Sequence, residues 1–73
     1  MITSRQIRAG RALLGWSRQF LADRAVVSLS TVQRLEEGKS DRRVSSIERI
    51  RKALEAAGVE FSNRGDDGVR IKP

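Results

Sequence analysis

Residues 29–36 carry side chains whose types and spacing could serve a binding function. If this segment is helical, Leu29, Ser30, Gln33 and Arg34 share one face, because positions three and four apart lie together on a helix. Arg34 can donate two hydrogen bonds to guanine O6 and N7, and Gln33 can pair with adenine. The hydroxyl of Ser30 can serve several bases, while Leu29 can touch a thymine methyl. The alternative is an ordinary polar surface on a helical bundle.

Basic side chains on either side of this segment could contact the phosphate backbone. Arg18 stands at the start of a predicted helix, where exposed amides and the helix dipole already favour an anion. Lys39, Arg42 and Arg43 follow the segment and could hold the other side of a groove by charge, which gives register without sequence information. A solvated basic loop is the alternative for these three residues.

The distribution of charge favours a polyanionic partner for the first half of the chain. Residues 1–35 hold six arginines against one acid, Asp23, whereas residues 36–73 hold nine basic and eight acidic residues. The net charge of the 73 residues is +6. We therefore expect double-stranded DNA to be the partner, although arginines can also form a merely solvated surface.

Several functional classes are disfavoured by what the chain lacks. It contains no cysteine and no histidine, which removes thiolate and imidazole metal ligands together with the commonest general base. A chain of 73 residues also has little interior for an enclosed catalytic cavity. No apolar run is long enough to cross a bilayer, and the N-terminus lacks the order of a signal peptide. We expect one soluble, cytoplasmic domain that is not an enzyme, has no cofactor and does not contact a membrane.

Capping signals predict the first three helices. Thr3 and Gln6 form a capping box before a helix that starts at about Ser4 and ends at Gly15. The apolar residues of that helix include Ile7, Leu13 and Leu14. Ser17 caps a second helix of about two turns, which we expect to direct Phe20, Leu21 and Ala25 toward a core. Ser28 caps a third helix in which Val32 and Leu35 point inward, and Gly38 ends it.

A fourth helix and a hairpin are predicted for the remainder of the chain. Ser45 and Glu48 form a second capping box, and Gly58 follows the last apolar position of the helix. After Gly58 the apolar period changes from helical to two, which predicts a β-hairpin around a turn-rich segment at 63–68. The alternating residues are Val59, Phe61, Val69 and Ile71.

The segment from Gly15 to Lys39 resembles the helix-turn-helix of Cro and the phage repressors, also called the xenobiotic-response-element family. The resemblance is close over this third of the chain and looser over residues 4–57. Its carriers are Leu21 and Ala22 in the first motif helix, Val27 and Ser28 at the entry to the second, and Val32, Leu35, Glu36, Gly38 and Lys39 at its end. It implies a four-helix, lambda-repressor-like, mainly α domain, with the helix at 29–36 placed in the major groove.

The resemblance also assigns structural roles and exposes departures from the family pattern. It implies a partly buried ion pair between Arg11 and Glu36, and a phosphate-contacting residue at the position of Arg18. Val26 stands where a glycine usually gives the turn its left-handed residue, so either the turn differs or stability is lost. Phe20 replaces a residue that is commonly polar, which suggests an apolar contact with Trp16 or the hairpin. The usual fifth helix is absent, and the hairpin takes its place.

The sequence thus predicts a helix-turn-helix domain at 1–58, with its motif at about 17–37, and a hairpin at 59–73 that serves dimerisation. The expected function is that of a dimeric transcriptional repressor that binds an inverted repeat. An isolated hairpin is marginal in water, and its open edge invites pairing with a second copy, so we place the dimer contact at Val59, Phe61, Val69 and Ile71. The alternative function is a protein-interaction module of the same fold, an antitoxin or anti-activator that captures a protein partner.

Overall fold

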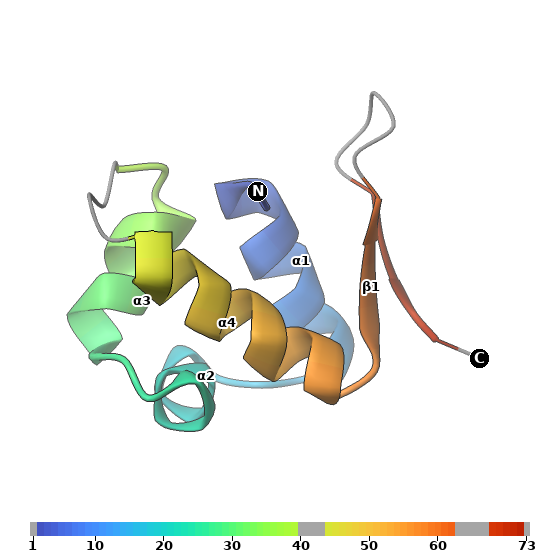
Figure 1. Cartoon of the computed structure of the whole chain (residues 1–73), viewed down its shortest axis with the longest axis horizontal. Helices are drawn as coiled ribbons and strands as arrows, with labels where there is room; N and C mark the ends of the chain where they lie inside the picture. The colour runs from blue at the N-terminus through green and yellow to red at the C-terminus, as the bar shows by residue number, and fades with distance from the viewer. Residues whose placement is uncertain (1, 40–43, 63–67, 73) are drawn as a thin grey trace.

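Four helices followed by a two-stranded antiparallel hairpin make up the computed structural model, which describes residues 2–39, 44–62 and 68–72 (Figure 1). The helices are α1 (Ser4–Leu14), α2 (Arg18–Ala25), α3 (Leu29–Glu36) and α4 (Val44–Ala56), and the strands are β1 (Val59–Ser62) and β2 (Gly68–Ile71). The predicted fold class, mainly helical with a C-terminal hairpin, is confirmed.

The first three helices begin at the predicted capping residues. The Thr3 hydroxyl accepts a hydrogen bond from the Gln6 amide at 3.2 Å, and the Gln6 side chain accepts one from the Thr3 amide at 2.9 Å. Ser17 and Ser28 cap α2 and α3 in the same way through their hydroxyls. Gly15 ends α1 in the left-handed conformation, with φ of 68°.

The start of α4 differs from the prediction. The helix begins at Val44, so Ser45 lies inside its first turn and is not the capping residue. The Glu48 carboxylate accepts hydrogen bonds from Arg51 at 3.2 and 2.5 Å, and this contact lowers the pKa of Glu48. The predicted capping box at these residues is therefore wrong, because Glu48 is engaged one turn further along the helix.

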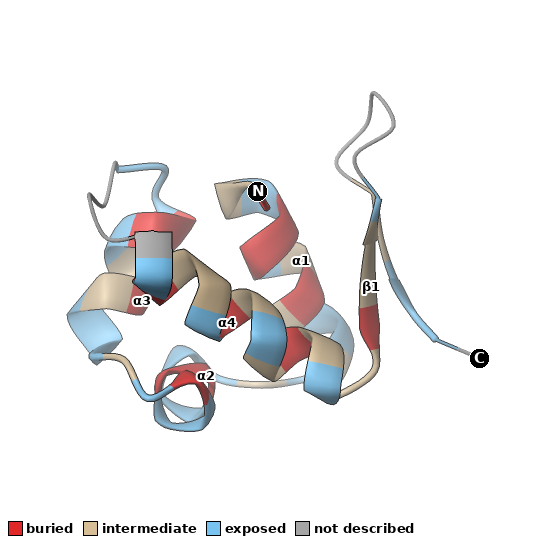
Figure 2. Cartoon of the chain, in the orientation of Figure 1, coloured by how far each residue is buried: buried red, intermediate tan, exposed pale blue. Residues whose placement is uncertain are grey.

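The core lies between the four helices and the first residue of β1 (Figure 2). Its largest fully buried apolar side chains are Ile7, Leu21, Val32, Ile50, Leu54 and Val59. Phe20, which was predicted to point toward the core, instead reaches solvent, because it is 46% exposed. Leu13, an apolar residue of α1, is 49% exposed. Phe20 packs edge-on against Trp16, with ring centroids 4.9 Å apart, which confirms the expected contact between these two residues.

Gln6 holds the hairpin against α1. Its side chain is completely buried, and the Nε2 amide donates to the carbonyls of Ser62 at 3.1 Å and Gly68 at 3.2 Å. These two residues form the cross-strand pair next to the hairpin turn. One side chain therefore caps the first helix and satisfies backbone groups of both strands.

The apolar side chains of the hairpin form two cross-strand pairs, Val59 with Ile71 and Phe61 with Val69. Residues that face each other in an antiparallel pair lie on the same side of the sheet, and here that side packs against the helical core. Val59 is completely buried, whereas Ile71 is 41% exposed. At this end of the hairpin β1 is thus anchored in the core of its own chain, whereas the facing residue of β2 is partly open to solvent.

Candidate nucleic-acid interface

The turn between α2 and α3 keeps a left-handed residue although that residue is valine. Val26 has φ of 57° and ψ of 48°, and its side chain is 75% exposed. The Val27 amide donates to the Ala22 carbonyl at 3.0 Å, which closes the end of α2. Because the side chain points to solvent, no neighbouring residue prevents the left-handed conformation. The backbone of a β-branched residue is nevertheless strained in this conformation. The substitution therefore preserves the geometry of the turn at a cost in stability.

Helix α3 presents the predicted face outward. Leu29, Ser30 and Arg34 are exposed, Gln33 is half-buried, and Val32 on the opposite face is completely buried. The Ser28 hydroxyl accepts from the Thr31 amide at 3.1 Å and so fixes the first turn of the helix. The structure thus brings the four sequence-predicted base contacts together on one short helix, with Gln33 less accessible than the sequence suggested.

The last residue of α3 is held by arginines from two other helices. Glu36 is 1% exposed, and its carboxylate accepts from Arg11 Nε at 2.7 Å and Arg11 Nη2 at 3.0 Å. This forked contact raises the pKa of Arg11. A second arginine of α1, Arg8, donates to the backbone carbonyl of Glu36. The partly buried ion pair implied by the family resemblance is confirmed, and Arg8 adds a contact that the sequence analysis missed.

Arg18 is not a freely extended side chain. Its Nε donates to Glu36 Oε1 at 3.0 Å, while the side chain remains 43% exposed. The position at the start of α2 agrees with the prediction, but the ion pair with Glu36 was not foreseen. Because Nε faces the carboxylate, the terminal nitrogens remain available to an anion outside the protein.

The opposite end of α3 is held through the turn that precedes it. Arg49, on α4, donates from Nη1 to the carbonyl of Val26 at 3.1 Å. Sequence reasoning missed this residue because an arginine on the polar side of a predicted helix gives no signal of a contact 23 positions earlier. Helix α3 is therefore positioned at its start by Arg49 and at its end by Arg8, Arg11 and Arg18.

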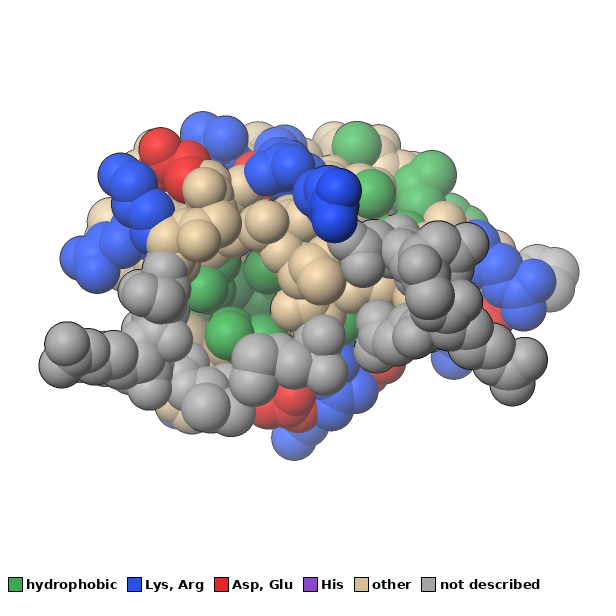
Figure 3. Space-filling model, turned by 90° about the horizontal axis from the view of Figure 1, so that it is seen from above, with side chains coloured by type: hydrophobic (Ala, Val, Ile, Leu, Met, Phe, Trp, Pro, Cys, Tyr) green, Lys and Arg blue, Asp and Glu red, His purple; other side chains and the backbone are tan. Residues whose placement is uncertain are grey.

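Basic groups surround this helix. Lys39 follows α3 and is exposed, whereas Arg42 and Arg43, the other predicted phosphate contacts in the loop, lie outside the described residues. In the view of Figure 3, Lys and Arg side chains lie at several places around the edge of the molecule, with Asp and Glu side chains among them. An exposed helix ringed by cations suits insertion into a groove lined by phosphates.

A family model described as helix-turn-helix matches residues 7–62, which is most of the chain. The chain belongs to the helix-turn-helix family. Within that family it is a DNA-binding regulator of the Cro and repressor type, as the sequence predicts. No curated protein matches this helix-turn-helix chain. In the part of the chain that the structure describes, no helix is long and apolar enough to cross a membrane.

Proposed function

We propose that this helix-turn-helix protein is a sequence-specific transcriptional repressor that binds an inverted repeat in duplex DNA as a homodimer. In the proposed complex α3 enters the major groove, with Leu29, Ser30, Gln33 and Arg34 at base edges. The observation that carries the proposal is the combination of an exposed outer face on α3 with contacts that fix both of its ends. A helix that reads bases must be held rigidly, because displacement by a fraction of an ångström weakens bidentate hydrogen bonds.

Arg18, Lys39, Arg42 and Arg43 are the proposed phosphate contacts. Arg18 is supported by its partial exposure and by the carboxylate of Glu36, which accepts from its Nε and so restricts its orientation. A side chain that is already oriented loses less entropy when it binds. Lys39 is supported by its exposure directly after α3.

The proposed dimer uses the open edge of β2. The Lys72 amide donates to the Gly58 carbonyl at 2.7 Å, which makes this a hydrogen-bonded pair of the ladder. Hydrogen-bonded and open pairs alternate in antiparallel strands, so Val69 and Ile71 turn their amides and carbonyls away from β1. Pairing with β2 of a second copy would satisfy these groups and cover Ile71. Val59, being completely buried, would support the hairpin without touching the partner.

Salt dependence of DNA binding tests the proposal against capture of a protein partner. A dimer that neutralises four phosphates in each half-site should lose affinity with a slope of about −7 in log K against log salt. Fluorescence anisotropy of a labelled duplex over a series of salt concentrations measures the slope. Absence of duplex binding even at low salt would contradict the proposal and favour a module that works through the hairpin edge or the Phe61 surface.

A further inference from the structure

An aromatic patch, which consists of Trp16, Phe20 and Arg24, lies on the solvent side of α2. Phe20 and Arg24 are four positions apart on the helix and both are exposed, while Trp16 precedes the capping residue. The chain has one tryptophan, two phenylalanines and no tyrosine, and Phe20 is the exposed one of these, at 46%. In Figure 1, α2 lies well away from the hairpin, so the patch is separate from the proposed dimer edge.

The Phe20 ring is held in place although much of it faces solvent. It packs against Trp16, with ring centroids 4.9 Å apart and an interplanar angle of 65°. The guanidinium of Arg24 lies over the ring, 5.9 Å from its centroid, which is a cation–π geometry. The Phe20 amide also donates to the Ser17 hydroxyl at 3.0 Å and so fixes the backbone. A surface group that is already oriented loses little conformational entropy when a partner binds.

The cation of the patch has no carboxylate partner. Within the described part of the chain no ion pair includes Arg24, and the carboxylate of the adjacent Asp23 accepts from Gln19 Nε2 at 2.9 Å. The donors of Arg24 therefore remain available to an anion outside the chain. Aromatic residues and arginine are also the types enriched at the centres of protein interfaces, so the composition of the patch suits a protein partner.

The size and geometry of the patch favour a short peptide segment over other occupants. A standard interface between folded proteins uses about 20–30 residues on each side, which excludes a second copy held by this patch alone. A nucleic-acid base needs an open ring face for stacking, but Arg24 covers one face of Phe20 and Trp16 is inclined to the ring. A peptide can place a carboxylate on Arg24 and an apolar side chain on the exposed part of Phe20.

We propose that the aromatic patch binds a short acidic segment of a partner protein. In this contact a carboxylate of the segment pairs with Arg24, and a neighbouring apolar side chain packs on Phe20 and Trp16. The inference goes beyond the proposed function and does not depend on DNA binding.

Selection from a displayed library of random short peptides tests the inference on the whole chain. Enriched peptides should combine Asp or Glu with a large apolar residue nearby. Their synthetic copies should change the fluorescence of Trp16, the single tryptophan of the chain, in a saturable titration. Phe20→Ser and Arg24→Gln should each weaken binding about tenfold, the loss typical of a central interface residue. Leu13→Ser removes a similarly exposed apolar side chain, 49%, from α1 and should change nothing.

Folding and duplex binding are measured on the same variants. Phe20 and Arg24 are exposed, so both variants should keep the circular dichroism spectrum of the parent, and Phe20→Ser should keep its duplex affinity. The inference is wrong if no acidic peptides are enriched, or if the enriched peptides bind the folded variants as tightly as the parent.

Two further results would also overturn the inference, because each assigns the patch to another occupant. One is a Trp16 signal that responds to single-stranded oligonucleotides and not to the enriched peptides. The other is self-association of the parent that Phe20→Ser abolishes. Failure of the parent to bind any duplex would contradict the proposed function alone and leave the peptide result unaffected.

Discussion

Val26 is the single described residue other than glycine with a positive φ. A left-handed conformation is strained for a β-branched side chain, because Cβ crowds the neighbouring carbonyl oxygen. Nothing in the exposure of the side chain offsets this cost, as three quarters of it faces solvent. The Arg49 contact to the Val26 carbonyl helps to hold the turn in place.

Val26→Gly should therefore stabilise the protein by about 1 kcal/mol. Glycine removes the strain of the left-handed conformation, and part of the gain is offset by the greater freedom of glycine in the unfolded chain. Urea unfolding of the variant and its parent measures the difference. A loss of stability would mean that the valine side chain makes contacts worth more than the strain it causes.

Glu36→Gln should destabilise the protein by about 2–3 kcal/mol. The substitution leaves Arg11 and Arg18 without their carboxylate, and the cost stays below that of a fully enclosed pair because both arginines reach solvent. Glu37→Gln, at the exposed neighbouring position, should change stability by less than about 0.5 kcal/mol. Equal effects of the two substitutions in thermal or urea unfolding would contradict the assigned role of Glu36.

At the scale of the elements, local signals predicted most of the fold. The caps at Thr3, Ser17 and Ser28 are short-range hydrogen bonds, so the sequence alone specifies them. The change of apolar period after Gly58 likewise predicted both strands. Contacts between distant segments gave no such signal.

Contacts that depend on tertiary partners could not be predicted from the sequence. Ser45 and Glu48 match a capping pattern, but an arginine one turn later competes for the same carboxylate. The capping pattern identifies Gln6 only as part of a cap, although its amide also reaches β1 and β2 across more than fifty residues. Tertiary partners decide such cases, and a pattern of neighbouring residues does not contain them.

The hairpin makes a prediction about assembly. Arginine at position 71 would place a charge at the proposed edge contact, so Ile71→Arg should convert the dimer to a monomer. The fold should survive, because Ile71 is 41% exposed whereas the buried Val59 is left in place. Light scattering and circular dichroism measure the mass and the helix content.

Leu13→Arg is the matched control, since Leu13 is exposed to a similar extent, 49%, but lies on α1. It should leave the dimer intact. A parent protein that is monomeric at all concentrations, or an Ile71→Arg variant that stays dimeric and folded, would show that β2 is not the interface.

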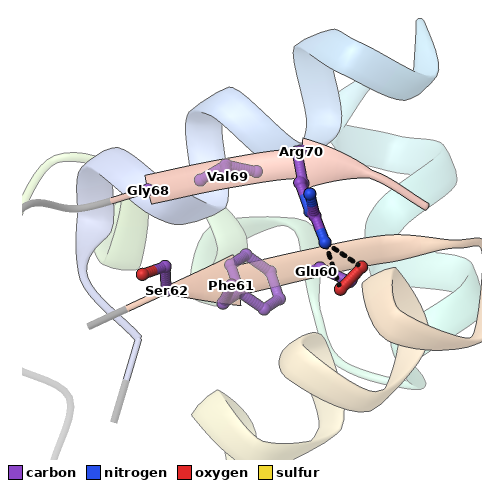
Figure 4. Close-up of a pocket in the computed structure, with 6 residues that line it drawn as sticks. All are labelled: Glu60, Phe61, Ser62, Gly68, Val69 and Arg70. Atoms are coloured by element: carbon purple, nitrogen blue, oxygen red, sulfur yellow. Dashed lines mark hydrogen bonds and ion pairs between the residues drawn. The ribbon is translucent and has the colours of Figure 1, made fainter. Parts of the chain in front are cut away.

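Figure 4 shows the hollow at this hairpin, where Arg70 reaches across to Glu60 at 3.2 Å.

At the scale of the whole molecule, helices α1, α2 and α4 hold α3 in place and leave its outer face exposed. Helix α3 is short, with eight residues, and would be unstable alone. Contacts from α1, α2 and α4 fix both of its ends and leave its outer face to solvent. The surrounding cations would attract DNA of any sequence, and the outer face would then choose among sequences.

The central claim is that the outer face of α3 chooses among sequences, whereas the surrounding cations attract any DNA. The most direct test is to select binding sites from randomised duplexes with the parent, Arg34→Ala and Arg18→Ala proteins. The parent should select an inverted repeat. Arg34→Ala should lose about 1–3 kcal/mol on that site and relax the preference at one position in each half-site. Arg18→Ala should bind all sequences more weakly and keep the parental preference. If Arg34→Ala retained the full preference of the parent, α3 would not read DNA through the face described, and the central claim would be contradicted.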